Sequence, residues 1–140
     1  MKRKQRTEIL LNSPRHLAER LALEIFSHYV IRNVEEPNNG LVMVKVRETA
    51  KQGLFYLGEV FITECKVMIE GQLGIGMVQG HKTELAYHLA IIDAAYNAEL
   101  PETFGWTDLL LAEKRVIEEK RAAQQAKILK TRVNFETMQV

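Results

Sequence analysis

The hydrophobic pattern of the chain changes its period at Gly80, and this change limits the fold more than any other feature of the sequence. Between Leu41 and Gly80, apolar residues alternate with polar ones or lie in runs rich in β-branched and aromatic residues, as in strands. Between His81 and Ala98 they recur with the spacing of a helix, at Leu85, Leu89, Ile92 and Tyr96. A group of strands next to helices predicts an α+β domain.

Two helices are predicted before the strands. Thr7–Asn12 has a short helical pattern, and Ser13 and Pro14 have the residue types of an N-cap and a first helical position. A second helix should therefore follow them and end near Ser27. Its apolar residues recur every four positions and give it one buried face, formed by Leu17, Leu21 and Ile25.

The middle of the chain predicts an antiparallel meander. A short strand is expected at Tyr29–Ile31, and Glu36–Gly40 has the Pro, Asn and Gly residues of a turn. Further strands are expected after Leu41 and from Phe55 to Gly71. The stretch Gly71–Gly80 predicts a tight turn and a last strand, whose glycines allow bulges or the close approach of another backbone.

The C-terminal part predicts a helix that does not belong to the core. Pro101 and Gly105 separate the central helix from Thr107–Lys130, whose composition favours helix at nearly every position. Its apolar seam is too narrow to hold a helix on a core, so it should lie along another chain. Thr131–Met138 is expected to form a strand-like tail.

The predicted fold class is α+β, with N-terminal helices, an antiparallel β-sheet, a central packed helix, and a long C-terminal helix with a strand-like tail. The chain of 140 residues has the length of a single domain. Within it we expect an α+β core, residues 1–106, and a partner-binding helical arm and tail, residues 107–140. The side chains expected to bury themselves against a partner are those of Leu109, Val116, Val133, Phe135 and Met138.

The composition excludes several classes of protein. Lys and Arg number 19 and Asp and Glu 18, and the net charge of +1 is too small to indicate nucleic acid or an anionic membrane as a partner. The single cysteine, Cys65, permits no internal disulfide. No apolar run reaches the ~20 residues that cross a bilayer, and the basic start leads into no signal-peptide core. The expected location is the cytoplasm.

The glycines before the central helix admit two interpretations. Gly74, Gly76 and Gly80 precede a helix whose amides, together with Lys82, are candidates for binding the phosphates of a nucleotide. However, the pattern matches neither a dinucleotide-binding fingerprint nor a Gly-Lys-Ser/Thr loop, and Ile75 and its neighbours favour a strand. Structural glycines are therefore the favoured interpretation, although Gly80 could still present free amides.

Ionisable residues near the central helix are the other candidates for a site. His81, Glu84 and His88 lie on one side of it, but His88 falls within an apolar arc and no supporting carboxylate can be named, so we predict no metal. Asp93 lies among small and apolar neighbours and needs either water or a fixed salt bridge. Cys65 is expected as a strand-packed thiol. His81 and Asp93 remain the candidates for a catalytic role.

Four blocks of the sequence resemble the G subunit of the carbon-phosphorus lyase core complex, the PhnG family. They are Gly58–Val67, Gly71-x-x-Gly74-x-Gly76-x-x-x-Gly80, Ala86-x-x-x-Ala90-x-x-Asp93-Ala94 and Thr131–Met138. Their order and spacing match the family over nearly the whole chain, and the two leading helices match it in pattern.

The resemblance implies a role in the breakdown of organic phosphonates. In that system the G subunit works with the H, I and L subunits to displace adenine from ATP by a phosphonate such as methylphosphonate, which gives ribose 1-phosphonate 5-triphosphate. The I subunit is credited with the nucleosidase chemistry, and the complex is expected to hold two copies of the G subunit. ATP is then a substrate of the complex, the iron-sulfur cluster and S-adenosylmethionine belong to the J subunit, and this chain needs no cofactor.

Three hypotheses follow. The first makes the chain an obligate, non-catalytic assembly subunit of the transferase, inactive alone. The second lets it contribute residues to the ATP or phosphonate site, through amides near Gly80 and through His81, Lys82 or Asp93. The third is an unrelated adaptor, which shares the arm and tail but not the four matching blocks, and copurified partners would separate it from the other two.

Overall fold

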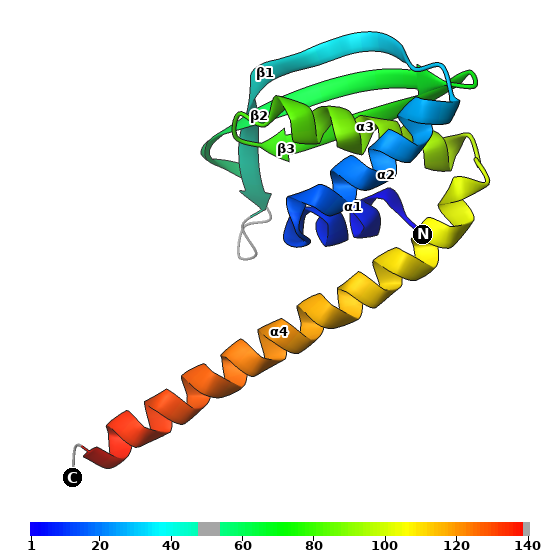
Figure 1. Cartoon of the computed structure of the whole chain (residues 1–140). Helices are drawn as coiled ribbons and strands as arrows, with labels where there is room; N and C mark the ends of the chain where they lie inside the picture. The colour runs from blue at the N-terminus through cyan, green and yellow to red at the C-terminus, as the bar shows by residue number, and fades with distance from the viewer. Residues whose placement is uncertain (48–53, 139–140) are drawn as a thin grey trace.

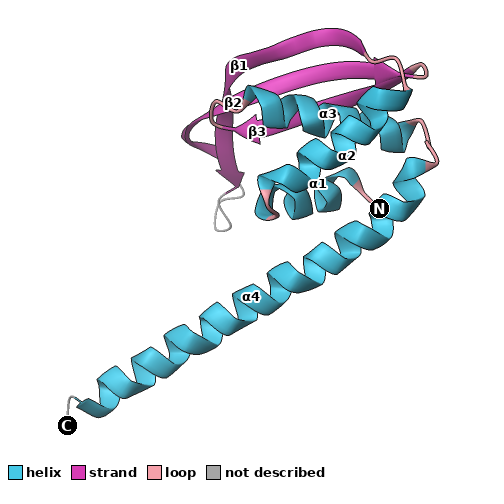
Figure 2. Ribbon diagram, in the orientation of Figure 1, coloured by secondary structure: helices cyan, strands magenta, loops and turns pink. Residues whose placement is uncertain are grey.

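Residues 1–47 and 54–138 are described by the computed structural model, and they form an antiparallel sheet with helices on one of its faces (Figure 1). The elements follow in the order α1 (Arg3–Asn12), α2 (Arg15–His28), β1 (Arg32–Arg47), β2 (Leu54–Ile69), β3 (Gln72–Gln79), α3 (Thr83–Asn97) and α4 (Glu102–Met138). Figure 2 shows the strands as one layer, with the helices on one side of it. The predicted α+β class with a long C-terminal helix is confirmed.

Within the described residues the sheet has the strand order β1-β2-β3 and both pairs are antiparallel, so the predicted meander is confirmed. Alternate residues of β2, the central strand, are buried against the helices: Thr63, Cys65, Val67 and Ile69. The register pairs Cys65 with Gly76 and Val67 with Gly74. Because paired residues share a face of the sheet, both glycines lie on its helix-facing side.

Two expectations for the region before β2 are wrong. Tyr29–Ile31 is not a strand, because Tyr29 caps the C-terminal end of α2 and its amide donates to Ile25 O. Glu36–Gly40 is not a turn but lies inside β1. β1 is an edge strand, where proline is tolerated. Shifts of register on either side of Glu35 allow this part of β1 to contain more residues than the part of β2 that pairs with it.

The two predicted N-terminal helices are present, but their ends differ from the expected ones. α1 begins at Arg3, earlier than the expected Thr7. Ser13 does not cap α2, because its hydroxyl donates to Ile9 O and Pro14 occupies the N-cap position. The predicted apolar face of α2 is buried as expected, through Leu17, Leu21 and Ile25.

α4 differs most from the sequence-based expectation. It runs to Met138 without a break at Gly105, and the strand-like tail at Thr131–Met138 is therefore wrong. Extending an existing helix costs little, so residues of modest helix propensity continue it. The first turns are buried in the core through Thr103, Trp106 and Leu110. This burial, roughly 1.5–3 kcal/mol for each large apolar side chain, outweighs the ~1 kcal/mol cost of a helical glycine.

α3 lies between the sheet and α2 and is the central helix of the core (Figure 1). Its buried residues are Ala86, Leu89, Ala90, Ile91, Ile92, Asp93, Ala94 and Ala95. A Cβ atom on Gly74 would overlap the backbone of Ala90 and Ala94, and one on Gly76 would overlap the backbone of Ala86. The predicted close approach of another backbone to these glycines is confirmed.

We expect Gly76→Val to lower the free energy of unfolding by about 3 kcal/mol or more, because the new side chain must displace the backbone of α3. Urea unfolding of the full chain measures this change. Gly40→Ala is the control, since a Cβ atom on Gly40 meets nothing within 4 Å, and a change within about 0.5 kcal/mol is expected. Equal stabilities of the two variants would contradict the close approach.

Candidate functional site

The carboxylate of Asp93 joins three elements of the core. The residue is 3% exposed, and Oδ1 accepts hydrogen bonds from Arg6 Nη2 at 2.7 Å and Arg3 Nε at 3.0 Å. Oδ2 accepts a hydrogen bond from the backbone amide of Ile75 at 2.9 Å. The salt bridge considered for Asp93 is therefore present, and it links α3 to α1 and to the edge of β3. With both oxygens engaged, this carboxylate is placed to hold the fold rather than to move a proton.

Arg6 is the central partner of Asp93, although the sequence pattern alone did not predict this role. Arg6 is 6% exposed, its Nη1 donates to Met1 O at 2.7 Å, and its guanidinium carbon lies 4.1 Å from the centroid of the Tyr96 ring. Burial lowers the pKa of Arg6, and the charge of Asp93 opposes this effect. The available signal was the spacing of Arg3 and Arg6 on one face of a helix, together with a carboxylate that needed a partner.

The amides proposed for phosphate binding are used within the chain. The hydroxyl of Thr63 lies 2.6 Å from Gly80 O, to which it donates, and it accepts a hydrogen bond from the Lys82 amide at 3.0 Å. The Gly80 amide donates to Phe61 O at 2.8 Å. These contacts fasten the start of α3 to β2. The amides of Gly80 and Lys82 therefore already have acceptors.

A hollow of about 400 Å³ lies beside the N-terminal end of α3. It is lined by Glu19 of α2 and by His81, Lys82, Thr83, Glu84, Leu85 and His88. His81 is exposed, and its Nδ1 lies 3.0 Å from Asn39 Oδ1. His88 is half-buried at the boundary of α2 and α3; burial lowers its pKa, and Glu19 and Glu84 oppose this effect. The hollow thus gathers His81, Lys82 and His88, while Asp93 lies elsewhere in the core.

Metal-ligating side chains and the thiol of Cys65 can also be located in the described part of the chain. Among residues 1–47 and 54–138, no three His, Cys, Asp or Glu side chains are grouped to hold a metal ion. Cys65 is fully buried, as expected of a strand-packed thiol, and burial raises its pKa to about 11. At neutral pH the thiol is therefore protonated and is a poor nucleophile. No helix within the same residues has the length and apolar character needed to cross a membrane.

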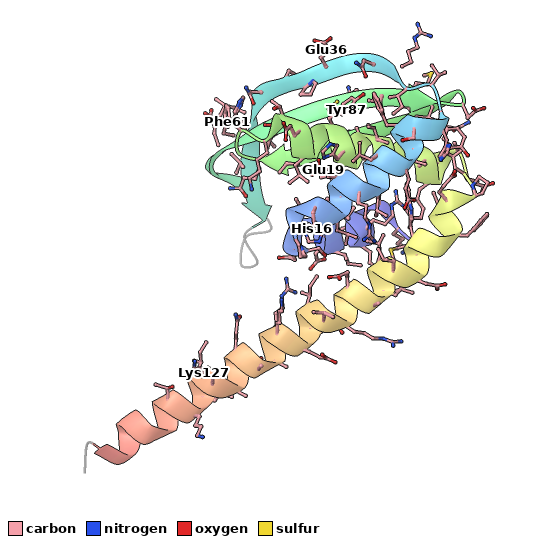
Figure 3. All side chains as sticks on the ribbon, viewed as in Figure 1. His16, Glu19, Glu36, Phe61, Tyr87 and Lys127 are labelled. Atoms are coloured by element: carbon pink, nitrogen blue, oxygen red, sulfur yellow. The ribbon has the colours of Figure 1, made fainter. Side chains whose placement is uncertain are left out.

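α4 is anchored at its start and then leaves the core (Figure 3). Trp106 is buried, and its Nε1 donates to Glu24 Oε2 of α2 at 2.8 Å. Every residue from Glu118 to Thr131 is exposed, and Figure 3 shows Lys127 on this projecting part. We call residues 118–138 the distal α4. It exposes two large apolar side chains, Ile128 at 67% and Leu129 at 53%.

The residues expected at a partner interface lie in different surroundings. Leu109 is partly buried against the core of its own chain, whereas Val116 is 42% exposed. Val133, Phe135 and Met138 lie on the helical backbone of the distal α4, and their side chains are outside the described part of the structure.

Asp93→Asn should lower the free energy of unfolding by about 3–5 kcal/mol, because it leaves the buried Arg6 without a counter-charge. Urea unfolding of the full chain tests this. Glu118→Gln is the matched control: it removes an exposed ion pair with Lys114 at 3.9 Å, and a change below about 0.5 kcal/mol is expected. If both variants unfold at the urea concentration of the wild type, the Asp93 pair does not hold the core.

Comparison with known proteins agrees with the resemblance of the four sequence blocks. The family described as "Phosphonate metabolism protein PhnG" matches residues 1–139, which span every helix and strand described above. No curated protein matches the chain. The match over nearly its full length shows that the chain belongs to the PhnG family of phosphonate metabolism proteins.

Proposed function

We propose that the chain is an obligate, non-catalytic assembly subunit of the carbon-phosphorus lyase system. In this role it supports transfer of a phosphonate such as methylphosphonate to C1′ of the ATP ribose, with release of adenine, and it is inactive alone. Membership of the PhnG family supports the phosphonate substrate class. The observation that carries the assembly role is the exposure of the distal α4, including Ile128 and Leu129.

The distal α4 needs a surface to lie on. Among the described residues, its ion pair with the rest of the chain joins Arg121 to Glu8 at 3.9 Å, and both side chains are more than half exposed. Such a pair contributes at most about 1 kcal/mol. Burial of Ile128 and Leu129 on a partner would contribute roughly 1.5–3 kcal/mol each. The distal α4 therefore gains more from a partner than from its own domain.

The proposed partners are the I subunit most directly, and the H, J and L subunits, with two copies of this chain in a cytoplasmic complex. The I subunit then supplies the nucleosidase groups, and the J subunit holds the iron-sulfur cluster and S-adenosylmethionine. ATP is a substrate of the complex. This division of labour is supported by the engagement of Asp93 with two arginines and by the protonated, buried thiol of Cys65.

The alternative is that the chain contributes residues to the ATP or phosphonate site. The hollow at the N-terminal end of α3 favours this alternative, because His81 and Lys82 are exposed beside it. A lysine at such a position would bind a phosphate group through a charge-assisted hydrogen bond. In the assembled complex a partner would have to complete this site.

The double variant Ile128→Glu, Leu129→Glu tests the assembly role. It keeps good helix formers and should leave the urea unfolding midpoint unchanged, because both side chains are exposed in the free chain. Its recovery with a tagged I subunit should fall at least tenfold. Gln124→Glu with Gln125→Glu adds the same charge to the distal α4 without removing an apolar side chain, and should bind almost normally. Normal recovery of the first variant would refute the proposed role of the distal α4.

Alanine variants of His81 and Lys82 test the alternative. In the reconstituted complex we expect either change to slow adenine release no more than a few-fold, because the proposal places the reacting groups on other subunits. A loss of about a thousandfold, as removal of a catalytic group can cause, in a complex that still assembles would instead favour the alternative. Gel filtration of each variant complex supplies the assembly control.

A further inference from the structure

The basic residues of the distal α4 are not balanced by acidic ones. From residue 120 to residue 135 the chain contains no Asp or Glu, and its basic residues there are Lys120, Arg121, Lys127, Lys130 and Arg132. The whole chain has 19 Lys and Arg and 18 Asp and Glu, so subtracting these five leaves 14 basic and 18 acidic residues elsewhere. Positive charge is therefore concentrated on the part of α4 that projects from the core (Figure 1).

The chain itself does not neutralise this charge. Among the described side chains, the ion pairs of the distal α4 join Arg121 to Glu8 and Glu118 to Lys114, each at 3.9 Å, and none involves the three lysines from residue 120 on. A helix dipole stabilises cations only in the last turn, and α4 continues for two more turns after Lys130. Like charges on neighbouring turns of a helix are unfavourable. The free chain thus carries a repulsion that an acidic partner would relieve.

The basic residues also lie on one side of the helix. At about 100° per residue, one half of the circumference contains Lys120, Arg121, Lys127 and Lys130. The opposite side is uncharged and contains Ala122, Gln125, Ala126 and Leu129. All of these residues are exposed. A surface that covers both sides of this segment needs negative charge on one wall and an uncharged wall opposite, which describes a groove.

We propose that the distal α4 binds in an acidic groove of the I subunit, with carboxylates facing Lys120, Lys127 and Lys130. This inference rests on the proposed assembly role and adds the chemistry of the surface that receives the helix. With a rise of 1.5 Å per residue, the three lysines lie about 10 Å and then about 5 Å apart along the helix axis. The carboxylates should follow the same spacing in a groove that covers residues 120–131, a length of about 18 Å.

An acidic protein groove fits the segment better than nucleic acid or an anionic membrane. A long polyanion would also face the rest of the chain, where acidic residues outnumber basic ones and would repel it. A helix that lies in a membrane surface buries one wide apolar face, whereas Ile128 lies on the basic side of the distal α4 and Leu129 on the other. Residues 118–131 contain no aromatic side chain to stack on bases. A second copy of the same segment would be repelled by its like charge.

Association kinetics of the full chain with an immobilised, tagged I subunit, measured between about 50 and 500 mM NaCl, test the acidic groove. The wild-type association rate should fall at least tenfold over this range, because salt screens the attraction between opposite charges. Changing Lys120, Lys127 and Lys130 together to Glu should lower the rate at about 100 mM NaCl at least tenfold and remove its fall with salt. Glu is as good a helix former as Lys, so circular dichroism should show an unchanged helix content.

Two further variants control for net charge. Changing Lys2, Arg20 and Arg32 to Glu reverses as many exposed basic residues on the core, and its association rate should stay within about threefold of the wild type. Gln124→Glu with Gln125→Glu leaves the basic residues of the distal α4 in excess, so it should slow association by no more than about threefold.

Three results would overturn the acidic groove: an association rate that salt does not change, a lysine variant that binds like the wild type, and a core variant as slow as the lysine variant. The assembly role survives these results if Ile128→Glu with Leu129→Glu still fails to bind, whereas normal binding of that variant refutes the assembly role itself. Wild-type binding to duplex DNA or to phosphatidylglycerol vesicles at about 150 mM NaCl, lost in the lysine variant, would make a polyanion the ligand and also overturn the proposal.

Discussion

The Asp93 carboxylate fixes the arrangement of the core, because it accepts hydrogen bonds from two arginines of α1 and from an edge amide of β3 at the same time. A buried arginine without a counter-charge is costly, so α1 can pack beside α3 only where Asp93 meets Arg6. The position of Asp93 in turn depends on α3 lying directly on β3. Gly74 and Gly76 make that approach possible, because any side chain there would meet the helix backbone.

This core leaves two parts of the molecule without partners in the described structure, and both suit a protein that works in an assembly. The distal α4 exposes apolar side chains along a helix that its own domain does not cover. β1, one of the two edge strands, exposes Leu41, Val42 and Met43, whereas backbone groups of β3 at the other edge bond to Asp93 and Asn97 of α3. The polar residues that could serve chemistry have mostly structural partners instead. Thr63 fastens the start of α3, and Asp93 binds Arg3 and Arg6.

The sequence predicted the features that depend on local pattern. β2, β3 and α3 follow from residue periodicity, and the close approach at Gly74 and Gly76 follows from glycines in a strand beside an alanine-rich helix. Features that depend on tertiary position were missed. Pro37 lies within a strand because that strand is at an edge, and Arg6 meets Asp93 across 87 residues that no local pattern connects. The helical tail was missed because residues that favour strands in isolation continue a helix already formed.

The central claim is that the core folds without partners and presents the distal α4 to partner subunits. Hydrogen-deuterium exchange of the chain alone and within the reconstituted complex tests this claim most directly. In the free chain, amides of residues 118–131 should exchange quickly, and the Ile75 amide should exchange slowly because it is bonded to Asp93. In the complex the distal α4 should become protected by at least tenfold, with little change at Ile75. Equal, rapid exchange of the distal α4 in both states would contradict this account.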